Sequence, residues 1–196
     1  MKRQARTISF YHSTQARLFW FVIFTSLVLL TFLSFRVMQG RAEVKTGQLP
    51  KPGVARQTFS TMDGQKFSLE STRGKVVVVQ FFGTWCGYSK RQVVTNNKLT
   101  SIGKSDELQV IGMAVKDPRS NSQAIKQFIA DQKVNYPVVG EVDDKYFVDF
   151  VDSRDVSVPQ TLIYGRDGRL LAHYLGYNQK VATEIEQRVE TELSKK

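Results

Sequence analysis

The chain has very few of the residues that form disulfides or bind metals. Its 196 residues include one cysteine, Cys86, and two histidines, His12 and His173. One cysteine cannot form a disulfide within the chain, so Cys86 is either inert or reactive toward outside partners. Two histidines and one cysteine make no spaced metal site, and we expect no metal and no other cofactor. His173 is interpreted as a partly buried strand residue.

Acidic residues are absent from the first 41 positions, although the chain contains 18 of them. Those positions carry six lysines and arginines, and so account for six of the ten net positive charges. The remaining net charge of +4 is ordinary for a soluble domain. The excess of positive charge therefore belongs mostly to the N-terminus, and we expect no nucleic-acid partner.

Charge is also absent from the 18-residue run LFWFVIFTSLVLLTFLSF at 18–35. A helix of 18 residues is about 27 Å long, close to the ~30 Å hydrocarbon core of a bilayer. Basic residues before the run resist translocation, which favours a cytoplasmic N-terminus. The predicted divisions are a cytoplasmic basic tail at 1–17, a transmembrane anchor at 18–36, a linker at 37–53 and an exported domain at 54–196.

This arrangement predicts a single-pass protein of the cytoplasmic (inner) membrane, with its domain in the periplasm or another extracytoplasmic space. A cleaved signal peptide is one alternative, with a small-x-small site at 40–42 in which Arg41 is unfavourable. A buried helix of a soluble domain is another, but such a helix is normally amphipathic, whereas this run is apolar on all sides.

Residues 54–196 alternate between strand-like and helix-like patterns. Asp63-Gly64 and Asp167-Gly168 lie between alternating runs, which is the signature of tight hairpins. The runs VVVVQFF and LQVIGMAV are typical of strands buried on both faces. The predicted order is hairpin, strand, helix, strand, helix, short helix, two hairpin strands and a last helix, for which Asn178 is the candidate N-cap. It indicates an α/β domain with a central mixed sheet, helices on both faces and an N-terminal β-hairpin extension.

The segment FFGTWCGYSKRQ, at 81–92, places Cys86 between a predicted strand and a predicted helix. The free N–H groups and the dipole at the start of a helix stabilise a thiolate over a thiol. Lys90 and Arg91 would add positive charge one turn later. A thiolate at this position is a nucleophile for disulfides, glutathionylated thiols or peroxides. Trp85 would form a flat apolar surface against which a substrate peptide can rest.

A second interpretation of this segment involves no chemistry. Cys86 would then be a small buried hydrophobe, and Trp85 would be ordinary core. The neighbours of Cys86 argue against it, because small and polar residues suit an exposed turn better than a packed core. These neighbours are Gly83, Thr84, Gly87 and Ser89.

FFGTWCGYSKRQ resembles the active-site segment of the thioredoxin superfamily. The layout of residues 54–193 resembles its membrane-anchored, exported TlpA/ResA/CcmG-like branch of thiol–disulfide oxidoreductases, in which a hairpin precedes the core fold. VSVPQTLIYGRDGRLL is similar to the family's segment with a cis-proline. The resemblance implies that Pro159 is that proline, faces Cys86, and receives an extended substrate strand on its backbone. The site residues it implies are Cys86, Trp85 and Ser89 in the catalytic segment, and Pro159, Val158, Tyr88 and Gly87 for substrate binding.

The departures from the family pattern form a coherent set. The second cysteine of the family is replaced by Ser89, and Tyr88 stands where many members have proline. Two positions where the family keeps a carboxylate that serves the second thiol hold Gln80 and Gln92. An engineered cysteine-to-serine trap would change Ser89 alone, so the pattern favours a natural single-thiol site. A parent gene with cysteine at position 89 would refute this preference.

One sulfur restricts the chemistry. Serine cannot resolve a mixed disulfide, so an external thiol must release whatever Cys86 has captured. The partners implied are client protein thiols or disulfides and small thiols, and the first hypothesis is thiol–disulfide exchange through mixed disulfides. The second is a redox-inactive thioredoxin-fold module that binds peptides and assists assembly. The third is a redoxin-type peroxidase. It is the weakest of the three, because such enzymes usually have a Thr-x-x-Cys segment and GTWC does not match it.

Overall fold

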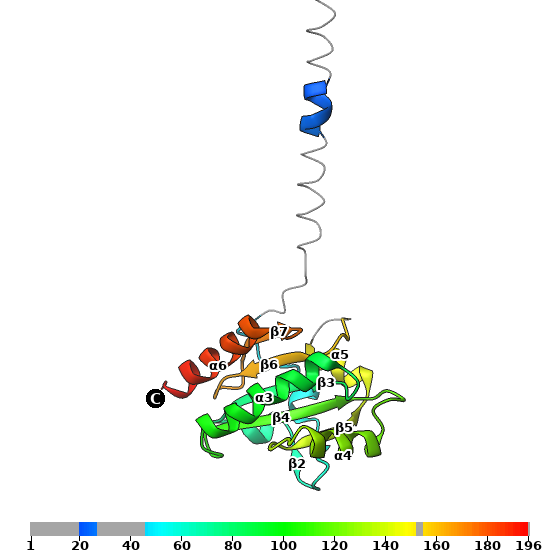
Figure 1. The fold of residues 1–196 in the computed structure, drawn as a ribbon. Coiled ribbons are helices and arrows are strands. Elements are labelled where there is room, and N and C mark those ends of the chain that lie inside the picture. Colours follow the sequence, from blue (N-terminus) through cyan, green and yellow to red (C-terminus); the bar gives the residue numbers. More distant parts are fainter. Residues whose placement is uncertain (1–19, 27–45, 152–154, 196) are drawn as a thin grey trace, which may run out of the picture. The chain divides into compact units, whose positions relative to one another are not determined.

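The structure is a computed structural model that describes residues 20–26, 46–151 and 155–195. By its internal contacts the chain divides into two units, Met1–Glu43 and Val44–Lys196, and each is considered by itself. The second unit holds the sheet and its helices (Figure 1). It also contains Cys86.

In the first unit, residues 20–26 are helical and exposed (blue in Figure 1). The hydroxyl of Ser26 donates to the carbonyl of Val22 at 2.7 Å, as a serine inside an apolar helix commonly does. Within the described ranges, no helix is both long enough and apolar enough to cross a membrane. Most of the predicted anchor at 18–36, namely 18–19 and 27–36, lies outside the described residues.

The second unit follows the predicted order of elements with three additions, namely short helices at 52–56 and 70–72 and a sheet strand at 138–142. The elements are α2 (Pro52–Arg56), β1 (Phe59–Ser60), β2 (Lys66–Phe67), η1 (Glu70–Thr72), β3 (Val76–Phe82), α3 (Gly87–Ile102), β4 (Leu108–Val115), α4 (Ser122–Asp131), β5 (Val138–Val142), α5 (Asp144–Val151), β6 (Gln160–Tyr164), β7 (Leu170–Leu175) and α6 (Gln179–Leu193).

The central sheet is mixed and has the strand order β5-β4-β3-β6-β7 (Figure 1). β3 pairs parallel with β4 and β4 with β5, whereas β6 runs antiparallel to both β3 and β7. Every residue of β3 is buried, which agrees with its unbroken apolar and β-branched sequence. The register Phe81↔Gln160 sets the end of β3 beside the start of β6.

Two hydrophobic clusters cover the two faces of this sheet. On one face, alternate residues of β3 such as Val78 pack with Val93 of α3, Phe128 of α4 and Ile185 of α6. On the other face the clustered residues come from α2, the β1–β2 hairpin and α5; they include Val54, Phe59, Phe67, Phe147 and Phe150. The predicted mixed sheet with helices on both faces is therefore confirmed.

Both edge strands of the sheet form backbone hydrogen bonds with segments that precede the sheet. At the β5 edge, Thr61 forms an isolated antiparallel bridge with Val139, which joins the N-terminal hairpin to the sheet. At the β7 edge, the amide of Gly47 donates to the carbonyl of Leu170 at 2.7 Å. Such pairing blunts strand edges that would otherwise be open to other chains.

The turns and caps predicted from single residues are also present. Gly64 and Gly168 have φ values of 86° and 75°, which a residue with a side chain rarely adopts, and each lies in its predicted hairpin turn. The side chain of Asn178 accepts from the amide of Val181 at 2.9 Å and so caps α6.

Candidate active site around Cys86

Cys86 lies where β3 passes into α3. The strand ends at Phe82, the loop turns at Gly83, whose carbonyl accepts from the Cys86 amide at 3.0 Å, and the helix begins at Gly87. Cys86 is the N-cap residue of α3, and its thiol is half-buried. First-turn amide groups of a helix have no acceptor within the helix, so a thiolate at this position faces unpaired N–H groups and the positive end of the dipole.

The segment before β6 provides the second wall of the site. The Sγ of Cys86 lies 3.5 Å from the carbonyl oxygen of Val158, which accepts the S–H hydrogen bond. The Val158–Pro159 peptide bond is cis, as the resemblance implied. The carbonyl of Pro159 accepts from the amide of Gly176 at 2.8 Å, which ties this segment to the end of β7. Cys86 and Pro159 are therefore brought together.

Trp85 is fixed against the protein by its neighbours. A Cβ at position 83 would lie 2.7 Å from the Trp85 ring, so only glycine leaves room for the indole there. The guanidinium of Arg119 lies over the ring, 4.2 Å from its centroid. This cation–π contact and the half-buried packing hold the indole beside Cys86.

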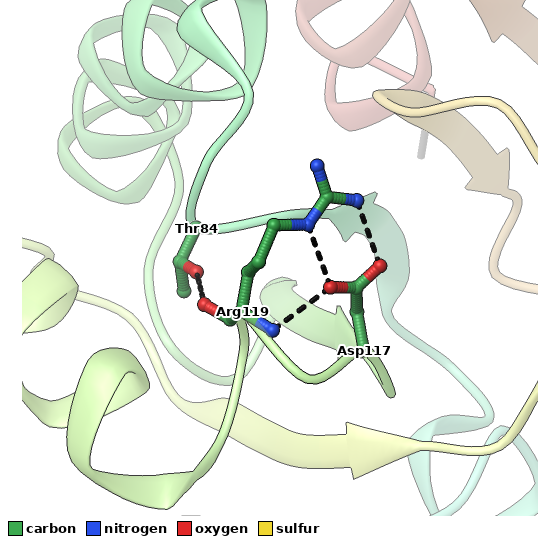
Figure 2. A network of polar contacts seen from close by, with 3 residues as sticks. All are labelled: Thr84, Asp117 and Arg119. Carbon is green, nitrogen blue, oxygen red and sulfur yellow. Dashed lines mark hydrogen bonds and ion pairs between the residues drawn. The ribbon is translucent and has the colours of Figure 1, made fainter.

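Arg119 is held in turn by two further residues, as Figure 2 shows. Its Nε and Nη2 donate to the two carboxylate oxygens of Asp117, both at 2.8 Å, and its backbone amide donates to the same carboxylate at 2.9 Å. The hydroxyl of Thr84 donates to the carbonyl of Arg119 at 2.8 Å. These side-chain and backbone hydrogen bonds from Arg119 lower the pKa of Asp117 to about 2. The loop after β4 is thus joined to the Cys86 loop by the Thr84 hydrogen bond and by the contact of Arg119 with Trp85, while Asp117 fixes the guanidinium within its own loop.

Ser89 lies in the interior of the protein, which corrects one part of the sequence analysis. It is one of the four neighbours of Cys86 that were expected in an exposed turn, but none of its surface is exposed, and Gly83 and Thr84 are buried as well. Its Oγ accepts from the Gly83 amide at 3.4 Å, and the first turn of α3 points the side chain inward. Gly87 and Tyr88 are exposed, and the Tyr88 ring lies 4.4 Å from the guanidinium of Arg91.

A cluster of neutral amides lies between α3 and the sheet. Gln80, Gln92 and Asn96 are almost fully buried. The amide of Gln92 donates to the hydroxyl of Thr161, and that of Asn96 to the carbonyl oxygen of Gln80. The hydroxyl of Tyr136 also donates to Gln80 at 3.3 Å, and burial raises the pKa of Tyr136 to about 12. The two positions where the family keeps a carboxylate therefore contribute no ionisable group below α3.

Comparison with known proteins identifies the family. The model of the AhpC/TSA family matches residues 50–173, which is more than half of the chain. The chain belongs to the AhpC/TSA family.

Individual relatives are more distant. This AhpC/TSA-family chain is 24% identical over 123 residues to the thiol-disulfide oxidoreductase ResA of Bacillus thuringiensis subsp. konkukian, covering 61% of this chain and 65% of ResA. It is 24% identical over 133 residues to the thioredoxin-like protein YneN of Bacillus subtilis, covering 68% and 74%. The chain thus spans just under two thirds of the length of ResA.

Solved structures share the fold. A thioredoxin-family thiol:disulfide interchange protein from Chlorobium tepidum superposes with a TM-score of 0.62 at 20% identity, covering 78% of this chain and 100% of that one. StoA from Bacillus subtilis gives a TM-score of 0.55 at 18% identity, covering 69% and 98%. The domain therefore has the thioredoxin-like α/β fold.

Sequence reasoning missed the residues that support the site from neighbouring strands. Asp117 and Arg119 follow β4, and their spacing of two residues gives no sign that they reach Trp85. His173 is a half-buried residue of β7, as predicted, but its bond to Gln160 at 2.7 Å was not foreseen, because no local pattern relates the two positions. In the part of the chain that the structure describes, no three His, Cys, Asp or Glu side chains gather where a metal ion could bind.

Replacing Arg119 should loosen Trp85. In a Trp20→Phe background, which leaves Trp85 as the sole tryptophan, Arg119→Met removes the guanidinium and should increase quenching of the indole fluorescence by acrylamide. Arg91→Met is the matched control, because Arg91 lies over Tyr88 instead.

The fluorescence emission of Trp85 in the Trp20→Phe background should not change in moderate acid. Because the pKa of Asp117 is lowered to about 2, its carboxylate is ionised above that pH and the pair with Arg119 is lost only as the pH falls toward 2. Emission should therefore stay constant from pH 7 to about 4. A change of the Trp85 emission near pH 4 would contradict the role of Asp117 in holding Arg119. Equal acrylamide quenching in Arg119→Met and the parent would contradict the role of Arg119 in holding Trp85.

Proposed function

We propose that this chain is a membrane-anchored, exported thioredoxin-like protein that carries out thiol–disulfide exchange through Cys86 alone. The observation that carries the proposal is the half-buried thiol at the N-terminus of α3, with its Sγ 3.5 Å from the Val158 carbonyl and next to Pro159. The name of the relative ResA, a thiol-disulfide oxidoreductase, supports the same chemistry.

The exchange step uses the groups around Cys86. The Cys86 thiolate attacks one sulfur of a client disulfide, a new S–S bond forms, and the client's other sulfur leaves as a thiolate. Unpaired amides in the first turn of α3 favour the attacking thiolate. An extended client strand can hydrogen-bond to the backbone before β6, near Val158, and rest on Trp85. A groove of about 250 Å³ beside Trp85, lined also by Lys90 and Arg119, extends the contact surface.

The second step needs a thiol from outside. Ser89 is buried and is not a thiol, so it cannot attack the mixed disulfide. A second, external thiolate attacks the Cys86–client bond, forms a disulfide with the client, and restores the Cys86 thiolate. Each turnover therefore exchanges disulfide partners and performs no net oxidation or reduction of a dithiol by this chain.

The uncharged run at 18–35 and the exposed apolar residues of the 20–26 helix support an anchor in the inner membrane. The thioredoxin-like domain would then lie outside the cytoplasm. Protease added to spheroplasts should digest the domain and leave the N-terminal tail protected. Protection of the domain until the cells are lysed would refute this orientation.

Introducing a second thiol at position 89 should change the fate of the mixed disulfide. Residues i and i+3 of a helix have Cα atoms about 5 Å apart, within the Cα separation of about 4.4–6.8 Å that a disulfide spans. With a disulfide-linked peptide, wild type should accumulate the Cys86–peptide adduct until an external thiol is added. Ser89→Cys should release the peptide unaided and form an internal disulfide. Mass spectrometry of the intact protein distinguishes the two products.

Ser89→Ala is the matched control and should behave as wild type. Absence of any adduct in wild type would count against exchange. Undiminished capture of the peptide by Cys86→Ser would instead favour a redox-inactive peptide-binding module. Faster loss of hydrogen peroxide with wild type than with Cys86→Ala, in the presence of thiol, would favour a peroxidase.

A further inference from the structure

The segment in front of Pro159 lies at the surface and carries the carbonyl that contacts Cys86. Residues 155–157 are exposed, and the local bonds are short-range, from the amide and hydroxyl of Ser157 to the carboxylate of Asp155 at 3.0 and 2.6 Å. The next residue, Val158, presents its carbonyl to Cys86. The position of that carbonyl therefore depends on contacts from residues outside the segment.

The side chain of Gln160 supplies this hold. Gln160 is the first residue of β6 and is 1% exposed. Its Nε2 donates to the carbonyl of Asp155 at 2.6 Å and to the carbonyl of Ser157 at 2.9 Å. One amide group thus joins two backbone carbonyls of the segment. Both of its hydrogens are directed at carbonyl acceptors, which fixes which end of the amide is nitrogen.

His173 completes the arrangement from β7. The Oε1 of Gln160 lies 2.7 Å from the Nε2 of His173, and since that oxygen can only accept, the histidine nitrogen must carry the hydrogen. The two residues are diagonal neighbours, because Gln160 pairs with Leu175 while His173 pairs with Leu162. Burial lowers the pKa of His173, and the nearby Asp155 carboxylate opposes this. Both the neutral Nε2–H form and the cation can donate this bond.

We propose that Gln160 and His173 are positioning residues that hold the Asp155–Val158 segment in the conformation that receives a client peptide. This proposal rests on the proposed function, because the peptide received is the disulfide client. Without the histidine donor, the buried Oε1 of Gln160 loses its hydrogen bond, and the orientation that directs Nε2 at the two carbonyls is less firmly held. The backbone pairing of β6 with β7 does not need either side chain, so the fold survives their replacement.

The test compares three variants of the full chain in detergent. His173→Leu removes the donor, His173→Gln supplies another donor of similar reach, and Tyr174→Leu alters the next β7 residue, which is also half-buried but does not bond to Gln160. The probe is an extended peptide whose one cysteine is joined to thionitrobenzoate, so that attack by Cys86 releases the coloured thiolate. Iodoacetamide, which needs no peptide site, reports the thiol alone.

His173→Leu should raise the peptide concentration needed for half-maximal rate by roughly tenfold, because small misplacements of a binding segment have large effects on rate. Its reaction with iodoacetamide should match wild type within about twofold. His173→Gln should restore peptide reactivity. Hydrogen exchange of the amides at 155–158 should be faster in His173→Leu than in wild type or His173→Gln.

Each other outcome has a defined meaning. Unchanged peptide kinetics and unchanged exchange in His173→Leu overturn the positioning role. Equal losses in His173→Leu and Tyr174→Leu also overturn it, since they indicate general destabilisation of β7. If wild type reacts with iodoacetamide but never with the peptide, the proposed function fails. The exchange measurement then still decides whether His173 orders the segment.

Discussion

The antiparallel pairing of β3 with β6 is the constraint on which the site depends. Register Phe81↔Gln160 places the end of one strand beside the start of the other. The loop that leaves β3 and the segment that enters β6 therefore lie at the same end of these two neighbouring strands. As a result, Cys86 and Val158, which are 72 positions apart in the sequence, lie in contact. The site exists because this one register places the start of α3 beside the segment that contains the cis peptide bond before Pro159.

Two neighbouring strands stabilise the two walls of the site. The loop after β4 holds the Cys86 side, where Arg119 covers Trp85 and is itself fixed by Asp117. β7 holds the Val158 side, where His173 bonds to Gln160. Both supports use charged or amide groups at the strand ends and leave the apolar clusters undisturbed. Stability of the fold and geometry of the site can therefore be altered separately.

The fold could be predicted from sequence because its signals are local. Runs of valine indicate buried strands, Asp-Gly pairs indicate hairpin turns, and Asn178 indicates a helix start. Position of the site could be predicted because Cys86 lies at a strand–helix boundary. The supporting contacts could not, because Arg119 and His173 act through pairings across the sheet that no local pattern specifies. Burial of Ser89 was missed because the first turn of α3 was taken as exposed.

Ser89 is buried beside Cys86, and the residues below α3 are neutral amides, so Cys86 is the group to which we assign the proposed exchange. The account requires that folding makes this thiol more reactive, because α3 offers it unpaired amides. The most direct test is the rate of Cys86 alkylation by iodoacetamide at about pH 6, in the native full chain and in the same chain unfolded in urea. We predict that the native protein reacts faster. A native rate below that of the unfolded chain, or no labelling of the native protein, would contradict the account.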